Sequence, residues 1–252
     1  MIKHFVDASC WFLYICFMKK VSILVRLFEG IYHHLTKGTK YFPEFLTYKG
    51  IKLGKRIWWG DMKTISIDYS RPSLVEIGDD VRINTGFTLM THDASNMVLR
   101  RLFNDFVPSS GKVKIGNNVY FGRWCTVLKG VEIGDNCIIG YGSVVTRSIP
   151  ANSVAIGRPA KVLCSIEDYY NKRKEHCIEE ALDYARSIQE RFGRKPEVNE
   201  FFEEFPLFLK GDELNDQLPI REQLRDSYEY YKKNNVPVFD GFDDFLKHAG
   251  IL

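Results

Sequence analysis

One histidine, His92, stands where a regular sequence pattern is interrupted. It is the sole histidine between residues 51 and 163. An imidazole has an ordinary pKa of about 6.5, so this residue type can take up or release a proton close to neutral pH. A histidine in a loop is, taken alone, more often held by local hydrogen bonds than used in a reaction. The pattern that surrounds His92 decides between the two interpretations.

The pattern is a six-residue repeat, clearest over residues 115–149. A branched aliphatic or aromatic residue opens each block of six, and small or aliphatic residues recur at the fifth place. The openings are Ile115, Phe121, Val127, Ile133, Ile139 and Val145, and the second column is Val119, Cys125, Val131, Cys137, Ser143 and Ile149. Hexapeptide periods predict a parallel β-helix, in which residues 18 positions apart stack about 4.8 Å apart. The spacing does not determine the handedness of the coil, and general chirality rules favour right-handed crossovers.

The same register begins earlier in the chain and is broken once. It is clear at Ile77 and continues through Ile83 and Leu89, but recognisable blocks return only at Ile115. Ile77 and Ile115 are 38 residues apart, which is one 18-residue turn plus about 20 further residues. We therefore predict a coil over residues 51–163, of about five turns, with a loop inserted at about residues 90–112. Loops inserted into a repeat often contain functional residues, so the position of His92 in such a loop favours a chemical role for it.

Composition disfavours several classes of function. The formal net charge of +3 is too small to indicate a nucleic-acid binder, which would carry a concentrated basic stripe. The six cysteines show neither a CxxC pair nor a disulfide-dense spacing. They predict reduced, buried thiols of a cytoplasmic protein, and no metal site is expected.

Helices are predicted on both sides of the coil. Residues 1–50 are predicted to form an N-terminal helical segment. Its apolar stretch, residues 5–18, is too short and too interrupted by charge for a membrane span. A signal peptide is not expected, because no small-x-small cleavage site follows this stretch at the usual distance. We expect the segment to pack on the coil or on a neighbouring subunit. A helix at a membrane interface, with the protein peripheral at the inner face of the membrane, is the alternative. Residues 164–252 form a C-terminal helical extension with a small aromatic core.

Three features together resemble the hexapeptide-repeat acyltransferases, and most closely the sugar O-acetyltransferases of bacterial surface-polysaccharide biosynthesis. They are the repeat, the loop opened by Thr91-His92-Asp93, and the ending Gly157-Arg158-Pro159-Ala160-Lys161. The resemblance is firm over residues 75–163 and looser over residues 51–74. It implies a mainly β fold, a left-handed parallel β-helix with N-terminal helices and a C-terminal α-helical extension. It also implies a homotrimer, with acetyl-CoA bound in a cleft between neighbouring coils.

The resemblance implies that His92 is the general base, on a loop that projects toward the next subunit. A neutral imidazole can take the proton of an acceptor hydroxyl as that hydroxyl attacks the thioester carbonyl, without a covalent acyl-enzyme. In the family a carboxylate, an amide or a backbone carbonyl orients the histidine, and Asn84 and Asp93 are the candidates here. A backbone amide at a coil corner or the side chain of Trp124 is the candidate donor to the oxyanion.

Residues that contact acetyl-CoA are also assigned by resemblance. The pantetheine arm is expected at two glycine-containing corners, where small residues let the backbone approach a ligand, and the phosphates are expected near basic residues. The assigned residues are Gly122, Arg123, Gly140, Tyr141, Ser143, Thr146, Arg147, Arg158 and Lys161. For each basic residue, the alternative is that its side chain lies in solvent at the rim of the coil and contacts no phosphate. Tyr141 departs from the small residue often found at its place, which indicates either a displaced pantetheine path or a stacking contact.

These inferences predict an acetyl-CoA-dependent O-acetyltransferase that acts on a hydroxyl of a sugar or glycan precursor. An N-acetyltransferase acting on an amino sugar is the nearest alternative, because the same base could deprotonate an ammonium acceptor. A non-catalytic β-helical scaffold of a polysaccharide-synthesis complex is a third possibility. A metal-dependent lyase resembling the γ-type carbonic anhydrases is disfavoured, since that chemistry needs several converging histidines and the coil sequence contains one.

Overall fold

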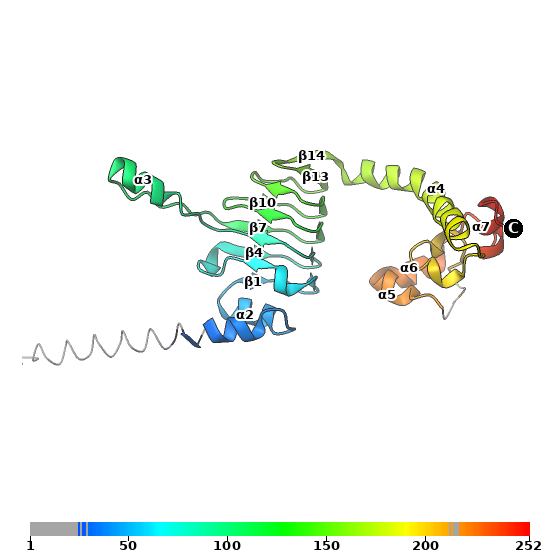
Figure 1. Ribbon diagram of the computed structural model, residues 1–252, viewed down its shortest axis with the longest axis horizontal. Helices are drawn as coiled ribbons and strands as arrows, with labels where there is room; N and C mark the ends of the chain where they lie inside the picture. The colour runs from blue at the N-terminus through cyan, green and yellow to red at the C-terminus, as the bar shows by residue number, and fades with distance from the viewer. Residues whose placement is uncertain (1–24, 26, 29, 212, 214–216) are drawn as a thin grey trace, which may run out of the picture. The chain divides into compact units, whose positions relative to one another are not determined.

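The computed structural model of the chain describes residues 25, 27, 28, 30–211, 213 and 217–252. These residues form two compact units that divide between Tyr169 and Tyr170. The first unit contains a coil of short parallel strands, and the second is helical (Figure 1). The predictions for residues 5–18 fall outside the described residues.

The coil consists of three sheets whose strands succeed one another in turn along the chain. Sheet A contains β1 (Lys52–Leu53), β4 (Val75–Ile77), β7 (Val113–Ile115) and β10 (Glu132–Ile133). Sheet B contains β2 (Trp58–Trp59), β5 (Arg82–Ile83), β8 (Val119–Phe121), β11 (Cys137–Ile139), β13 (Ser153–Gly157) and β14 (Ala160–Ser165). Sheet C contains β3 (Ser66–Ile67), β6 (Thr88–Leu89), β9 (Thr126–Val127) and β12 (Val144–Val145). Pairing is parallel except between β13 and β14, which close the coil as an antiparallel pair.

The register of the strands confirms the six-residue columns. Ile115 pairs with Ile133, and Val127 with Val145, so each pair is 18 residues apart. Ile77 pairs with Ile115 across the insertion. The first turn is longer because two 3-10 helices, η1 (Met62–Thr64) and η2 (Pro72–Leu74), lie at its corners. That extra length explains why the repeat is imperfect before residue 75.

Burial follows the same columns. The opening residues of the blocks, from Ile77 to Val145, are buried in one continuous core. In this core the ring centroids of Phe87 and Phe121 lie 4.9 Å apart. Cys125 and Cys137 are free, buried thiols, and burial raises the pKa of both. Glycine is required at the tight corners: a Cβ on Gly134 would collide with the backbone of Ala151 on the next rung.

Helices cover the first turn of the coil. Residues 30–36 are helical, and α2 (Phe42–Tyr48) buries Phe42, Phe45 and Leu46 in the same core as the strands. Trp59 packs against this core, with its ring 6.1 Å from that of Phe42. Among the described residues, no helix has both the length and the apolar character that a membrane span requires.

The second unit begins within α4 (Ile166–Phe192) and has its own core. It continues through η3 (Val198–Glu200), η4 (Phe205–Leu207), α5 (Ile220–Leu224), η5 (Arg225–Ser227), α6 (Tyr228–Asn234) and α7 (Phe242–His248). One face of α4, formed by Ala181, Leu182, Ala185 and Ile188, is buried against an aromatic cluster that includes Phe201, Phe205, Phe208 and Phe245.

Candidate functional site

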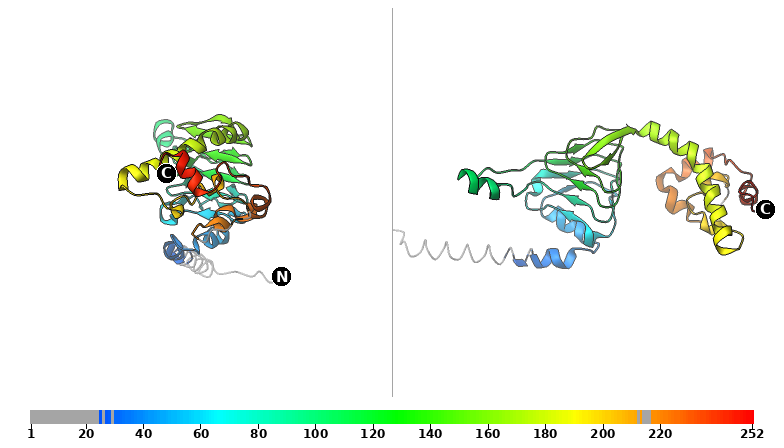
Figure 2. Two further views of the ribbon diagram at one scale, coloured as in Figure 1. Left: turned by 90° about the vertical axis from the view of Figure 1, so that its right-hand side faces the viewer. Right: turned by 45° about the horizontal axis from the view of Figure 1, so that its top comes forward.

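An arm leaves the coil at the end of β6 and returns to it at β7. Its outer part is α3 (Asn96–Phe103), and it projects away from the strands (Figures 1 and 2). At the base, His92 and Ser110 form an antiparallel bridge, and the amide of Gly111 donates to the carbonyl of Thr91 at 2.9 Å. Within the described structure no residue of α3 is buried. His92 therefore lies at the fixed end of a projecting arm.

A carboxylate on the preceding rung contacts the imidazole. The Nδ1 atom of His92 lies 2.6 Å from Oδ2 of Asp68, the residue that directly follows β3. The Asp68 carboxylate also accepts hydrogen bonds from the amide and hydroxyl of Thr91 and from the amide and hydroxyl of Ser70. Its side chain is 14% exposed, whereas that of His92 is 38% exposed. Asp68 is thus held in place by its hydrogen bonds, and part of the His92 side chain remains exposed to solvent.

Asp68 determines which nitrogen of His92 can act as a base. Burial works to raise the pKa of this carboxyl, but hydrogen bonds from Ser70, Thr91 and His92 outweigh burial and hold the pKa well below its usual range. An ionised carboxylate can only accept, so a neutral His92 carries its proton on Nδ1. The lone pair of Nε2 is then available to take a proton.

The two candidate orienting residues do not contact the imidazole. Asn84 is buried and donates to the carbonyl oxygen of Phe121 at 2.7 Å. The Asp93 carboxylate accepts from the Ser95 amide at 2.9 Å and from the Ser109 hydroxyl at 3.0 Å, and it forms an ion pair with Lys129. In this structure Asp68 contacts the imidazole, whereas Asn84 and Asp93 bind other groups.

Sequence reasoning missed Asp68 because the first turn departs from the 18-residue period. A uniform period would place residue 74 beneath His92. In the structure Ile67 pairs with Leu89, 22 residues apart, so Asp68 lies beside the start of the arm instead. The aliphatic alternation of Ile65 and Ile67, followed directly by a carboxylate, is the signal that could have located it.

The residues assigned to acetyl-CoA fall at both ends of sheet C and in the β13–β14 pair that closes the coil. Gly122, Arg123, Gly140 and Tyr141 share the corner between sheets B and C, on successive rungs joined by the bond from the Gly142 amide to the Arg123 carbonyl at 2.9 Å. Arg158 reaches this corner, because its Nε donates to the carbonyl of Gly142 at 2.5 Å. Thr146 and Arg147 are exposed at the opposite end, after β12, and Lys161 is exposed in β14.

Ser143 does not present its hydroxyl to a ligand. Its side chain is fully buried; the hydroxyl donates to the carbonyl of Gly140 at 2.7 Å and accepts from the amide of Gly157 at 3.2 Å. Ser143 therefore joins two rungs of the coil. A contact between Ser143 and acetyl-CoA would therefore use its backbone, and that contact stays a prediction.

Trp124 occupies an unusual backbone position at the same corner. Its φ is +63°, and the residues at the equivalent corner of neighbouring rungs are Gly86 and Gly142, both also at positive φ. A bulky residue in this region is uncommon. The indole lies directly against Gly86, where a Cβ would collide with it, and 51% of Trp124 is exposed. In a single chain Trp124 lies at the opposite end of sheet C from His92, so one chain does not bring the two together.

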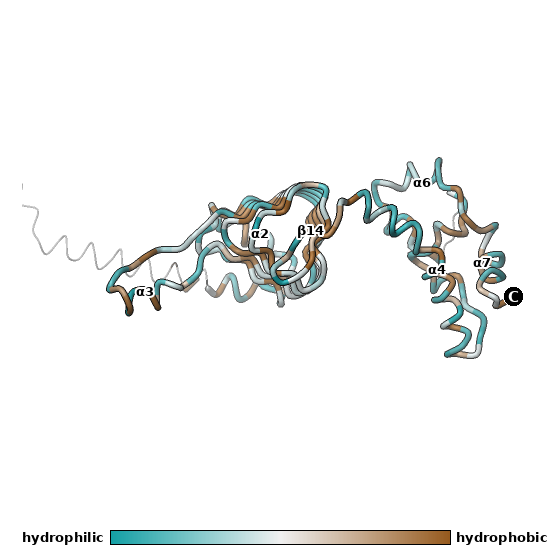
Figure 3. Tube along the Cα trace, turned by 90° about the horizontal axis from the view of Figure 1, so that it is seen from above, coloured by the Kyte–Doolittle hydropathy of each residue, from teal (hydrophilic) through white to brown (hydrophobic). Residues whose placement is uncertain are grey.

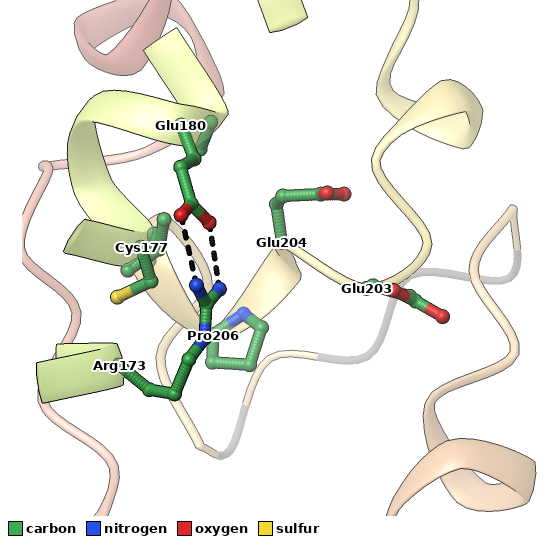
Figure 4. A pocket seen from close by; sticks show the side chains of 8 residues that line it. Arg173, Cys177, Glu180, Glu203, Glu204 and Pro206 are labelled. Carbon is green, nitrogen blue, oxygen red and sulfur yellow. Dashed lines mark hydrogen bonds and ion pairs between the residues drawn. The ribbon is translucent and has the colours of Figure 1, made fainter. Parts of the chain in front are cut away.

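The helical unit contains a cavity of about 300 Å³, and no histidine is among its lining residues. Figure 4 shows Arg173 and Glu180 of α4 in a bidentate ion pair at its wall, with bonds of 2.8 and 2.6 Å. Glu204 also lines the cavity, and burial raises the pKa of its carboxyl. Over the part of the chain that the structure describes, no group of three histidine, cysteine or acidic residues is placed to hold a metal ion.

The coil has known relatives. The sequence model of the family described as bacterial transferase hexapeptide (six repeats) matches residues 112–147. The galactoside O-acetyltransferase of Escherichia coli (strain K12) is 37% identical over 135 residues, covering 52% of this chain and 64% of that protein. Protein CapG of Staphylococcus aureus is 35% identical over 141 residues, covering 54% of this chain and 78% of CapG. A solved structure of galactoside acetyltransferase in complex with coenzyme A matches 57% of this chain and 82% of its own, with 26% identity and a TM-score of 0.42. The chain thus spans less than two thirds of the galactoside O-acetyltransferase of Escherichia coli.

Proposed function

The chain belongs to the family of bacterial hexapeptide-repeat transferases, and we propose that it transfers an acetyl group from acetyl-CoA to a hydroxyl of a sugar or glycan precursor. The observation that carries the proposal is the 2.6 Å contact between Nδ1 of His92 and Asp68, because it leaves Nε2 as the base nitrogen. The name of the 37% identical galactoside O-acetyltransferase supports both the acetyl group and the sugar class of acceptor.

In the proposed reaction His92 acts as base and then as acid. Nε2 takes the proton of the acceptor hydroxyl while its oxygen attacks the thioester carbonyl, and the tetrahedral intermediate forms. The intermediate collapses with cleavage of the carbon–sulfur bond, and the imidazolium returns its proton to the departing thiolate. The products are an acetyl ester and CoA. The ionised Asp68 stabilises the imidazolium between the two steps.

The proposed donor site uses the corner that contains Gly122, Arg123, Gly140 and Tyr141, with Arg158 beside it. Glycine lets the backbone approach the pantetheine arm, and the guanidinium groups suit phosphate charge. A backbone amide of a corner is our proposed oxyanion donor. Arg147 and Lys161 remain proposed phosphate contacts.

We also propose that the active assembly is a homotrimer of left-handed coils in a polysaccharide-synthesis pathway, as the resemblance implies. Within one chain, His92 and the corner of Arg123 lie at opposite ends of sheet C. A site that combines them needs residues from two coils. The arm supports this assembly because its apolar side chains, Val98, Leu102 and Phe103, are exposed. Figure 3 shows hydrophobic stretches in the part of the arm that contains α3.

The test is the release of CoA thiol from acetyl-CoA in the presence of a mixture of sugars and oligosaccharides. We expect His92→Gln to lose turnover by about 10²–10⁴-fold while binding CoA almost as tightly as the wild type. His248→Gln, a surface histidine of the helical unit, is the matched control. A His92→Gln protein that keeps most of its activity would defeat the mechanism.

Two further measurements separate the alternatives. Comparison of hydroxyl acceptors with amino-sugar acceptors, with mass analysis of the product, distinguishes an ester from an amide. The non-catalytic scaffold predicts that acetyl-CoA causes no thermal shift and that no acceptor releases CoA, whereas specific binding raises the unfolding temperature.

The membrane remains a proposed partner of the N-terminal segment. Leu27, Ile31 and Leu35 recur at helical spacing and are exposed within the described structure. An apolar stripe of this kind can lie at a membrane interface or pack on another subunit. Flotation of the full chain with anionic vesicles, compared with a chain that lacks residues 1–40, distinguishes the two.

A further inference from the structure

We infer that Asp93, Ser109 and Lys129 form a clamp that positions His92 by closing the base of the arm. The inference rests on the proposed role of His92 as the base. Asp93 and Lys129 are positioning residues in this account, since neither side chain contacts the imidazole.

The clamp joins three separate segments of the chain. Asp93 lies where the chain leaves the coil, Ser109 lies where the arm returns to it, and Lys129 belongs to the coil after β9. The Ser109 hydroxyl donates to the Asp93 carboxylate at 3.0 Å, and the Lys129 ammonium contacts both side chains. The bonds from Lys129, first, and then from Ser95 and Ser109 hold the pKa of Asp93 well below its usual range. The carboxylate is therefore charged, and the three groups form one network.

Few other contacts join the two sides of the arm near Asp93 and Ser109. The backbone bond from the Asp93 amide to the Ser109 carbonyl is long, at 3.4 Å, and the next bond, from Gly111 to Thr91, is on the coil side of His92. Beyond Asp93 the arm buries no residue of α3 in the described structure. Movement of the outer arm would therefore displace His92 unless the chain is fixed between α3 and His92. Asp93 lies in that stretch of the chain.

The clamp and Asp68 hold His92 from two different rungs. Asp68 comes from the rung before His92, because Ile67 pairs with Leu89. Lys129 comes from the rung after it, because Leu89 pairs with Val127. Thr91 is bound to Asp68, and Asp93 is bound to Lys129, so both chain neighbours of His92 are anchored. This arrangement fixes the backbone of His92 and keeps Nδ1 on Asp68.

Lys129→Met removes the ammonium but keeps the length of the side chain, so it tests the clamp directly. We expect kcat to fall about ten- to a hundred-fold, the range caused by displacing a catalytic group by about 1 Å, with an almost unchanged KM for acetyl-CoA. Lys129→Arg, which keeps the charge, should restore most of the loss. Lys114→Met, which breaks the 2.8 Å pair with Glu132 on sheet A, is the matched control and should leave kcat unchanged.

A spectroscopic measurement tests positioning without relying on turnover. In ¹⁵N-labelled wild-type protein above pH 8, the ring nitrogen shifts of His92 should report the Nδ1–H tautomer alone, with His92→Gln used to assign the signals. In Lys129→Met we expect a mixture of both tautomers. A folded Lys129→Met protein with the wild-type tautomer and wild-type kcat would overturn the clamp.

The same data distinguish the clamp from the proposed function. If His92→Gln keeps full activity, the catalytic proposal fails, while a tautomer change in Lys129→Met would still support positioning. If Lys129→Met does not fold, Asp93→Asn is measured in its place with the same two readouts, kcat and the His92 tautomer. If both single variants fold, the Asp93→Asn/Lys129→Met double variant tests whether they act together. Equal losses in the single and double variants would support one network, and additive losses would overturn it.

Discussion

Replacing Asp68 with asparagine keeps the shape of the side chain but exchanges one acceptor oxygen for a donor. Oδ1 of Asp68 accepts from the amide of Ser70 at 3.0 Å, and Oδ2 accepts from the amide of Thr91 at 3.2 Å. An amide NH₂ placed at either position faces a backbone donor. One backbone N–H then lacks its acceptor in either orientation, which costs about 1–3 kcal/mol of folding stability.

The same substitution acts on the base. With the NH₂ group at the Oδ2 position, it donates to Nδ1 of His92, so the proton moves to Nε2 and the base nitrogen is lost. In the other orientation an acceptor remains, but the charge that stabilises the imidazolium is gone. Both outcomes lower kcat, by about 10²–10⁴-fold. KM for acetyl-CoA should change little, since Asp68 is not among its proposed contacts.

Urea unfolding and CoA release measure the two effects. The pKa of Asp68 is depressed in the fold, so its stabilisation is complete above the unfolded carboxyl pKa of about 4 and is lost as the pH falls below it. The stability difference between wild type and Asp68→Asn should therefore be full at about pH 7 and shrink below about pH 4. Asp61→Asn, at an exposed cap of η1, is the control. A folded Asp68→Asn protein with kcat within threefold of wild type would refute the proposed role of Asp68.

Three other predictions concern packing. Gly134→Ala should destabilise the coil by more than Gly130→Ala, because a Cβ at 134 meets backbone atoms whereas a Cβ at 130 meets none within 4 Å and costs only the strain of positive φ, about 1–2 kcal/mol; thermal unfolding measures the difference. Gly86→Ala should be more costly in the wild type than in a Trp124→Ala background, because the new Cβ enters the space of the indole; a double-mutant cycle measures this coupling, and additive effects would contradict it. Phe245→Ala, at a fully buried ring, should lower the stability of the helical unit by about 3–5 kcal/mol and leave the tautomer of His92 unchanged.

The coil was predictable from the sequence because its core depends on a strict period. Ile115 and Ile133 carry that period, and their pairing confirms it. The arm was predictable for the same reason, since an insertion shifts every later block by a fixed number of residues. His92 could then be located at the start of the insertion, where we propose that it transfers the proton.

The partner of His92 was not predictable by the same reasoning. Asp68 lies on the first turn, where η1 and η2 add residues at two corners and the 18-residue rule fails. Asn84 and Asp93 are near His92 in sequence, but the direction of a side chain depends on its place in the rung. Asn84 bonds a backbone carbonyl, and Asp93 faces Lys129. Periodicity predicts stacking, and it does not specify the partners of side chains at an interruption.

The two carboxylates near His92, those of Asp68 and Asp93, make different contacts. Asp68 binds the ring, and Asp93 binds the chain to Lys129. Both anchors belong to rungs of the coil, so His92, the proposed base, is positioned by the repeat rather than by residues 94–108. Those residues can then differ in length and sequence without displacing Nε2. We expect substitutions in α3 to change which acceptor is used, and substitutions at Asp68 or Lys129 to change the rate for every acceptor.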